Sequence, residues 1–279
     1  MKIYNDVLQK ILDEGVDREG RNGNTRALFA IQMRFPLQEG FPAVTTKKLA
    51  FKAVKSELLW FLAMKATDRA SDEALKMLNG SERTIWTDNA EADYWMPKSQ
   101  FKGDLGRVYG IQWRNWHGPS GEAIDQIADL IEKIKKSPYD RRLIVTAWNP
   151  GELSDMALPP CHMFFQCFVA NGKLSLHMVQ RSCDMFLGVP FNIASYSLLL
   201  HMLAQVTGLK AGECILTLQD AHIYHEHFDA VKEQLSREPF PLPQLWLNPA
   251  IKTIDEFTMD DIKLENYQSH PSIKARMIV

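Results

Sequence analysis

Residues 180–196 read QRSCDMFLGVPFNIASY, and this stretch limits the possible folds more than any other part of the chain. Polar side chains that suit hydrogen bonds to a phosphate or a base edge stand here among apolar residues that can exclude water. Asn192 follows Pro190 and Phe191 at the expected start of a helix. Its side chain is therefore either the N-cap of that helix or an amide that reads a base edge.

Helix and strand patterns extend outward from this stretch on both sides. Apolar residues at helical spacing predict helices over 51–65, 122–136 and 193–206. Apolar runs predict strands over 142–148, 163–170, 173–181 and 214–219, and Asn171-Gly172 predicts a two-residue hairpin between the middle two. Because strands and helices follow one another without βαβ alternation, the expected fold class is α+β.

Residues 69–104 differ in character from the rest of the chain. They are polar, carry aromatic residues in patches and lack a clear period, so we expect a small subdomain inserted into the main body. Pro239, Pro241 and Pro243 predict an extended edge or loop. No internal repeat or low-complexity linker divides the sequence, so one α+β domain over residues 1–279 is the expected organisation.

Composition narrows the class of protein. The 279 residues are 46% hydrophobic, 24% charged and carry a net charge of −2, which is typical of a globular domain and gives no reason to expect nucleic acid as a partner. No apolar run approaches the roughly 20 residues that span a bilayer, so no membrane partner is expected. The four cysteines lack CxxC spacing, which argues against a disulfide framework and favours a reducing, cytoplasmic location.

Cys161 lies in the segment ALPPCHMF (157–164), between a proline pair and a predicted strand. The prolines fix the backbone approach, which suits a side chain that must be presented. A thiol becomes a nucleophile when nearby cations lower its pKa, and Arg141, Arg142 and Arg181 stand at neighbouring strand ends. A small buried cysteine beside solvated arginines is the alternative, and composition alone does not decide between them.

Other candidates also have structural alternatives. Glu57 is either the polar residue of an amphipathic helix or a functional carboxylate, and it interrupts an otherwise apolar stretch. Trp86 and Tyr109 are compatible with ordinary core aromatics. His222, His225 and His227 form an HxxHxH pattern, but no cysteine or carboxylate ligand set accompanies it, so no metal is expected.

Seven segments together resemble the thymidylate synthase family. They are GFPAVTTKK (40–48), SELLWFL (56–62), DRRLIVTAWNPGEL (140–153), ALPPCH (157–162), residues 180–196, DAHIY (220–224) and HPSIKA (270–275). The resemblance implies a homodimer built on a mixed β-sheet with flanking helices. It also implies a methyltransferase that moves the one-carbon unit of 5,10-methylenetetrahydrofolate to C5 of dUMP.

The same resemblance implies roles for the matching residues. Cys161 would be the nucleophile that adds to C6 of the pyrimidine, because C5 is not nucleophilic until C6 is saturated. Glu57 would organise water and proton transfer near O4, and Tyr109 would assist proton removal at C5. Asn192 would read the uracil edge and favour dUMP over dCMP. Members of the same hydrogen-bonded network would be His162 and Gln180.

Contacts to the two ligands are implied in the same way. The phosphate would bind Arg21, Arg181 and Ser182, together with Arg141 and Arg142 donated across a two-fold interface. The deoxyribose 3′-hydroxyl would bind His222 and Tyr224. The folate would contact Lys47, Trp86, Asp184 (placed also among the nucleotide contacts), Leu187, Gly188, Phe191 and the closing C-terminal residue Val279.

Four positions depart from the family pattern. The loop Arg-Thr-Gly-Thr-Gly is replaced by the shorter RNGNT (21–25), and Thr87, Gln219 and Ile278 stand where Asp, Gly and Ala are common. These changes surround the place where the reaction intermediate is quenched, so two products stay open. We expect a methyl product, and a deoxyuridylate hydroxymethylase is the alternative. A catalytically silent nucleotide- or RNA-binding paralogue is disfavoured by the retained reactive residues and the absence of a basic patch.

Overall fold

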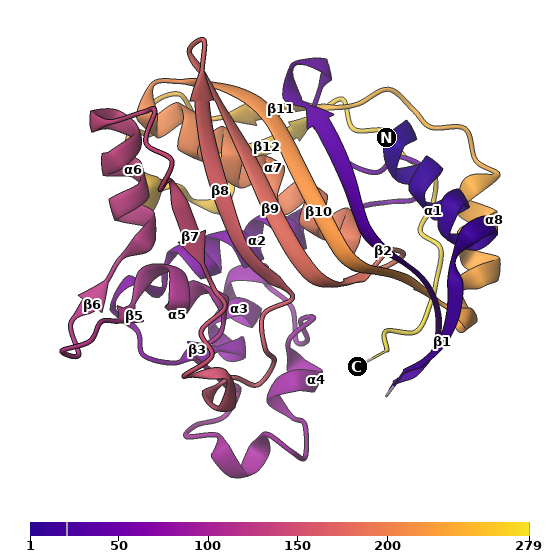
Figure 1. Cartoon of the computed structure of the whole chain (residues 1–279), viewed down its shortest axis with the longest axis horizontal. Coiled ribbons are helices and arrows are strands. Elements are labelled where there is room, and N and C mark those ends of the chain that lie inside the picture. The colour runs from indigo at the N-terminus through magenta and orange to yellow at the C-terminus, as the bar shows by residue number, and fades with distance from the viewer. Residues whose placement is uncertain (21, 279) are drawn as a thin grey trace.

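A six-stranded sheet forms the centre of the computed structural model, which describes residues 1–20 and 22–278 (Figure 1). The strands lie in the order β1-β2-β10-β9-β8-β7. Their bounds are β1 Val16–Gly20, β2 Gly23–Pro36, β7 Ile144–Thr146, β8 His162–Ala170, β9 Lys173–Asp184 and β10 Lys210–Tyr224. Two predicted site residues, Arg21 and Val279, lie outside the described residues.

The sheet is mixed, which confirms the predicted α+β class. All neighbouring strands are antiparallel except β9 and β10, which are parallel and are joined by α7 (Val189–Thr207). Parallel neighbours need a crossover connection, so β9-α7-β10 is a βαβ unit. The expectation that no βαβ unit occurs was therefore wrong at this place, because the strand direction depends on tertiary pairing.

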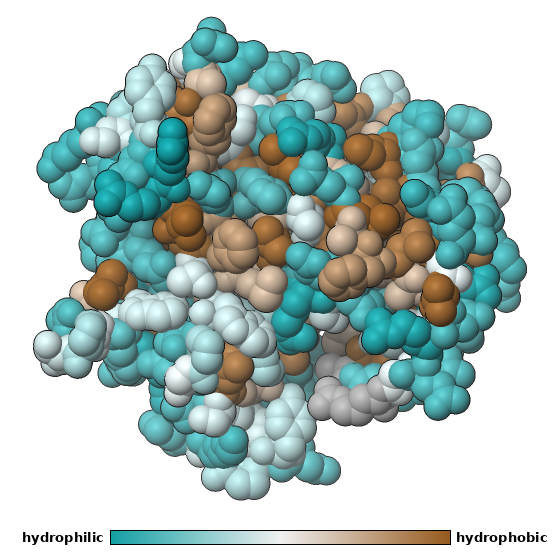
Figure 2. All heavy atoms as spheres, in the orientation of Figure 1, coloured by the Kyte–Doolittle hydropathy of each residue, from teal (hydrophilic) through white to brown (hydrophobic). Residues whose placement is uncertain are grey.

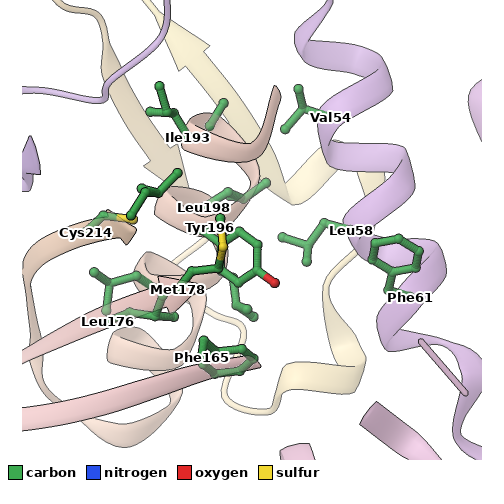
Figure 3. Close-up of a cluster of buried hydrophobic side chains, with 14 of the residues drawn as sticks. Val54, Leu58, Phe61, Phe165, Leu176, Met178, Ile193, Tyr196, Leu198 and Cys214 are labelled. Carbon is green, nitrogen blue, oxygen red and sulfur yellow. The ribbon is translucent and has the colours of Figure 1, made fainter. Parts of the chain in front are cut away.

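Helices α2 (Phe51–Leu62) and α7 cover one face of the sheet, and Figure 1 shows them behind the strands. Figure 3 shows the core between them, where Leu58 of α2 points toward Tyr196 of α7 and Met178 of β9. Each fully buried side chain of this size contributes roughly 1.5–3 kcal/mol to stability. The remaining helices are α1 Lys2–Glu14, α3 Asp72–Asn79, α4 Thr87–Ala90, α5 Tyr109–Arg114, α6 Gln126–Lys136 and α8 Phe228–Leu235.

Helix α7 is long and apolar enough to cross a membrane by length and composition alone. The expectation that no apolar run approaches that length was wrong for this helix. Yet 72% of its most apolar window is buried inside the fold, and its residues pack against β9, β10 and α2. The helix is apolar all round because protein surrounds it, which is the pattern of a core helix.

The turn between β8 and β9 confirms the predicted hairpin and aligns the two most informative motifs. Asn171 and Gly172 adopt φ values of 51° and 71°, the left-handed conformation that a two-residue hairpin turn requires. The register that follows pairs Ala170 with Lys173 and, at the other end, His162 with Gln180. The cysteine motif is thereby placed beside the start of the 180–196 stretch.

The opposite face of the sheet carries no covering helix. Phe29 of β2 and Phe168 of β8 are 78% and 68% exposed there, and Figure 2 shows brown residues gathered across the centre of this face. The strand pairing of β2 with β10 skips Ala30, opposite Gln219, because Ala30 has a φ of 63°. The face therefore combines exposed apolar side chains with polar pairs such as Gln32–Thr217 and Arg34–Glu213, and β2 has one residue with a positive φ.

The shorter elements lie around this sheet. Residues 69–104 include α3 and α4, and the ribbon β3 (Ala70–Ser71) with β4 (Asp104–Gly106) closes the segment. The status of this segment as an inserted subdomain stays a prediction.

The helix predicted over 122–136 begins only at Gln126, because β6 (Ala123–Ile124) pairs with β5 (Trp116–His117). The other ribbon is β11 (Gln244–Leu247) with β12 (Ile262–Glu265), and the Pro239–Pro243 stretch before it is irregular, as predicted. Short 3₁₀ turns occupy Leu37–Glu39, Met64–Ala66, Met96–Lys98, Leu153–Asp155, His225–His227, Ile254–Glu256 and Met259–Asp261.

Candidate active site

Cys161 sits on a turn that Arg181 holds in place. The backbone N–H of Arg181 donates to the Cys161 carbonyl at 2.8 Å. Its guanidinium donates from Nε to the Pro160 carbonyl at 2.9 Å and from Nη2 to the Pro159 carbonyl at 2.8 Å, and it lies over the Trp148 ring. The third guanidinium nitrogen, Nη1, has no hydrogen-bond partner among the described residues. An anion at this position would find a preorganised donor.

Among the described residues, the charges near Cys161 do not activate its thiol. Burial raises the pKa of Cys161, and the Arg181 guanidinium opposes that effect without overcoming it. The sequence predicted that nearby cations lower this pKa, and the difference arises because only one of the three predicted arginines is close. A further positive charge near the sulfur would be needed to favour the thiolate.

Arg141 and Arg142 lie at the far end of β8. Strand β7 pairs Ile144 with Gln166, so Arg142 lies beyond Gln166 and roughly 17 Å or more along the strand from Cys161. The Arg142 side chain is 85% exposed and pairs only with Asp140, at 3.0 Å. The structure therefore does not bring these two arginines to the cysteine of the same chain.

Tyr109 and His162 flank the cysteine. The backbone N–H of Cys161 donates to the Tyr109 phenol oxygen at 2.6 Å, and the two rings of Tyr109 and His162 stack at 4.0 Å. The His162 Nδ1 atom lies 2.7 Å from the Tyr196 hydroxyl. Burial lowers the pKa of His162 to about 3, so the imidazole is neutral over the physiological range.

Glu57 and Trp86 form the next layer of the site. The Trp86 indole donates to the Glu57 carboxylate at 2.7 Å, and its ring packs on Tyr109 at a centroid distance of 5.7 Å. Burial raises the pKa of Glu57 to about 7, and the indole hydrogen bond opposes this rise. A carboxyl group with this pKa can both donate and accept a proton near neutral pH. Glu57 is therefore not a solvated polar residue of an amphipathic helix, while Trp86 belongs to the buried core and also binds Glu57.

Asn192, in the first turns of α7, and Gln180, near the end of β9, both carry side-chain amides. The N-cap of α7 is Gly188, so the alternative in which Asn192 caps this helix was wrong. The Gln180 amide donates to the Ser182 carbonyl at 2.9 Å, while its buried Oε1 atom has no partner among the described residues. A buried acceptor without a partner costs about 1–3 kcal/mol, so a bound donor at this point would be favoured.

Asp184 holds the backbone conformation of the residues that lead into α7. Its Oδ1 atom accepts the backbone N–H groups of Phe186 and Leu187 at 2.9 and 3.1 Å, and Gly188 follows as the helix begins. A Cβ atom at Gly188 would lie 3.3 Å from the Asp184 carbonyl oxygen, so the glycine allows a close backbone approach. Phe191 lies half-buried in the first turn of the helix.

Lys47 is turned inward beside this segment. Its amine donates to the Phe186 carbonyl and lies 3.5 Å from the centroid of the Phe186 ring. Burial lowers the pKa of Lys47 to about 7, against the attraction of Asp184. The predicted contact of Lys47 with a folate tail stays a prediction, and it requires this side chain to swing outward.

His222 and Tyr224 lie at the end of β10, next to Asp184 of β9. The Nδ1 atom of His222 is 3.1 Å from the Asp220 carbonyl and 3.2 Å from the Asp220 carboxylate, which Arg18 also binds at 2.6 Å. The Nε2 atom of His222 has no hydrogen-bond partner among residues 1–20 and 22–278. Arg18 lies in β1, the strand that directly precedes residues 21–25.

The three histidines of the HxxHxH pattern have separate partners. His222 is bound to Asp220, His225 to Asp17 at 3.0 Å and His227 to the Arg276 carbonyl at 2.9 Å. Across residues 1–20 and 22–278, no group of three His, Cys, Asp or Glu side chains is arranged to hold a metal ion.

Three residues that contact this site were missed by the sequence reasoning. Tyr196 lies one helical turn beyond Asn192, so the i, i+4 spacing on α7 was a usable signal for its place on the same face. Trp148 and Asp220 gave no such signal, since their contacts with Arg181 and His222 depend on strand pairing. The hydrogen bond between His227 and the backbone carbonyl of Arg276, near the C-terminus, likewise depends on long-range packing.

A presented thiol, an arginine with an unused donor, a phenol and a buried carboxyl group define a candidate site for nucleophilic catalysis on an anionic substrate. The family model described as thymidylate synthase matches residues 2–279. The chain belongs to the thymidylate synthase family. Enzymes of this family transfer a one-carbon unit from methylenetetrahydrofolate to C5 of dUMP, so the protein is a pyrimidine C5 one-carbon transferase with nucleotide and folate as small-molecule substrates.

Proposed function

We propose that the protein is a thymidylate synthase that converts dUMP and 5,10-methylenetetrahydrofolate to dTMP and dihydrofolate. The observation that carries this proposal is the convergence of Cys161, Tyr109 and Glu57, in which the Tyr109 phenol oxygen is 2.6 Å from the Cys161 backbone nitrogen. A nucleophile and two proton-transfer groups within one buried site are what a covalent addition followed by proton removal requires.

Each step of the proposed reaction is carried out by particular residues of this chain. The Cys161 sulfur adds to C6 of dUMP, while Nη1 of Arg181 binds the phosphate. Glu57, with a pKa of about 7, exchanges a proton near O4 of the base. The Tyr109 phenol accepts the Cys161 N–H, so its own proton points away from the backbone toward the substrate. Asn192 and the unpartnered Gln180 Oε1 satisfy the uracil edge.

The residues at the start of α7 fit a folate. Asp184 uses only Oδ1 on the backbone among the described residues, so Oδ2 is available to an N–H donor of a pterin. Gly188 leaves room for a flat ring, with Leu187 and Phe191 as apolar neighbours. The folate would supply the electrophilic one-carbon unit and then the hydride that reduces the methylene intermediate to a methyl group, which leaves dihydrofolate. Trp86 and Lys47 complete the proposed contact set.

We further propose a homodimer in which Arg141 and Arg142 serve the site of the other subunit. Two observations support this proposal. Arg142 is too far along β8 to reach Cys161 of its own chain, and the uncovered sheet face exposes Phe29 and Phe168. Exposed apolar faces of this kind are typical of interfaces. A donated pair of arginines also supplies the positive charge that the Cys161 thiol lacks. A cytoplasmic location is proposed as well, supported by four free cysteines.

The methyl product is preferred over the hydroxymethyl product because of the position of Thr87. This residue is 1% exposed, and its hydroxyl is occupied by Asp72 and by the Thr84 backbone N–H. It therefore offers no free hydroxyl group to hold a water molecule beside Trp86. Exclusion of water favours reduction of the intermediate over hydration.

The test is product analysis with dUMP and methylenetetrahydrofolate. We expect equal amounts of dTMP and dihydrofolate, seen as the absorbance rise of dihydrofolate and as the mass of a methyl group on the nucleotide. Cys161→Ser is the matched control and should give neither signal. Consumption of dUMP with a hydroxymethyl product and no dihydrofolate would replace the proposal with the hydroxymethylase function.

A further inference from the structure

Asp72, in the first turn of α3, is a fully buried carboxylate outside the site described above. Both of its oxygen atoms are engaged. Oδ1 accepts the Thr84 hydroxyl, and Oδ2 accepts the Thr87 hydroxyl at 2.8 Å and the Lys76 amine at 3.0 Å. A buried charge retained with this many partners holds its neighbours in a defined geometry.

The two threonine hydroxyls link this carboxylate to the backbone around Trp86. The Thr87 hydroxyl accepts the backbone N–H of Thr84 at 2.9 Å, and the Thr84 hydroxyl accepts the backbone N–H of Trp86 at 3.0 Å. Because each hydroxyl group has one proton, donation to Asp72 leaves its lone pairs free to accept these N–H groups. The turn over residues 84–87 is therefore closed by a complete set of hydrogen bonds.

The turn carries the indole that binds the catalytic carboxyl group. Trp86 packs against Phe61 and Trp60, and its Nε1–H donates to Glu57 at 2.7 Å. Those ring contacts restrict the orientation of the indole plane, but they do not fix the position of the Trp86 backbone. The only polar groups among the described residues that bind the Trp86 backbone N–H belong to the Asp72 cluster. Helix α3 is itself anchored, since the Asp72 N–H donates to the Gly103 carbonyl at 2.8 Å.

We propose that Asp72 is a positioning residue that, through Thr84 and Thr87, holds the Trp86 indole on Glu57. The inference rests on the proposed function, in which Glu57 transfers protons. Asp72 touches neither ligand and acts only through Trp86. Through Asp72, Thr84 and Thr87, the segment 69–104 would have a role in the reaction in addition to the contribution of Trp86.

The identity of residue 87 is matched to Asp72. An aspartate here would place a second buried carboxylate against Oδ2 of Asp72, with like-charge repulsion and two desolvated charges. The hydroxyl of threonine removes that conflict and donates a hydrogen bond. A carboxylate at position 87 is therefore tolerated only when the carboxylate at position 72 is replaced as well.

The experiment compares Asp72→Asn, Thr87→Val, Thr87→Asp and the double variant Asp72→Asn with Thr87→Asp. We expect each single variant to lower kcat roughly tenfold or more, a loss of about 1.4 kcal/mol in transition-state stabilisation. KM for dUMP should change little, because no dUMP contact is altered. The double variant should recover activity relative to Thr87→Asp. Met77→Ala, which alters a 79% exposed residue of the same helix, should behave as wild type.

The pH–rate profile distinguishes positioning from general destabilisation, because destabilisation alone does not shift the pKa of Glu57 that the profile reports. Loosening the indole hydrogen bond removes a contact that lowers the pKa of Glu57. The limb of the profile that follows Glu57 should therefore move to higher pH in Asp72→Asn and Thr87→Val, but not in Met77→Ala.

A measurement without turnover separates this inference from the proposed function. In protein labelled with ¹⁵N-tryptophan, the Trp86 indole N–H resonance, assigned through Trp86→Phe, should shift and exchange faster with D₂O in Asp72→Asn and Thr87→Val. If wild type shows no synthase activity but the resonance responds, the proposed function fails and the positioning contact stands. An unchanged Trp86 resonance in these folded variants, or a double variant no better than Thr87→Asp, overturns the inference.

Discussion

Glu57 shows at the residue scale how a proposed catalytic group opposes stability. Its pKa is raised from 4.5 to about 7 by burial, so the unfolded chain releases the Glu57 proton more readily than the folded chain. Below pH 4.5 both states are protonated and the residue has no cost. As the pH rises from 4.5 to about 7, the folded state loses stability, to a total of about 3 kcal/mol, and the cost is constant above that pH.

Glu57→Gln should therefore stabilise the protein while it lowers kcat. The amide keeps an oxygen atom for the Trp86 indole and carries no charge. Denaturant unfolding at pH 4.5 and pH 8 is the measurement: the variant should gain stability over wild type only at the higher pH. An equal difference at both values would contradict the raised pKa of Glu57.

Asn192 is the residue whose substitution should change the choice of base. Its side chain is not used to cap α7, so a carboxyl group at this position alters the donor–acceptor pattern without removing a helix cap. Asn192→Asp should raise the dCMP to dUMP ratio of kcat/KM, measured with both nucleotides under the same conditions. Gln180→Glu, at the amide whose Oε1 atom has no partner among the described residues, serves as comparison. An unchanged ratio would mean that Asn192 does not read the base.

At the scale of elements, the features that depend on local chemistry were predicted and those that depend on register were not. Asn171-Gly172 specified its hairpin because only φ > 0 residues fit the turn, and the apolar runs gave α2 and α7 within a few residues. The parallel pairing of β9 with β10 and the distance of Arg142 from Cys161 arise from strand order. Neither is encoded in a local pattern, and the same holds for the cluster around Asp72.

The kink in β2 gives a prediction about stability. Ala30 has a φ of 63°, a conformation that costs an L-residue roughly 1–2 kcal/mol. Ala30→Gly should relieve this strain and, after the greater freedom of glycine in the unfolded chain is subtracted, raise stability by about 1 kcal/mol. Ala27→Gly, at a regular position of the same strand, should instead lower stability. Urea midpoints of both variants give the measurement, and a lower midpoint for Ala30→Gly would argue against strain at this residue.

At the scale of the whole molecule, the proposed shared site predicts complementation between two inactive proteins. Arg142→Ala lacks the donated charge, and Cys161→Ser lacks the nucleophile. In a mixed dimer one site combines an intact Cys161 with an intact Arg142, so activity should approach one quarter of wild type when the subunits mix randomly. Mass spectrometry of the intact dimer verifies the exchange. Verified mixed dimers without activity would rule out the donation of Arg142.

In the proposed dimer, the separation of Arg142 from Cys161 along β8 would also make catalysis depend on dilution. A single subunit would then carry its nucleophile at one end of β8 and its anion-binding pair at the other, and so hold half of each of two sites. Specific activity should then be constant at high protein concentration and fall as the dimer dissociates. The sheet that organises the core of each subunit would in this way also determine the lowest concentration at which the enzyme works.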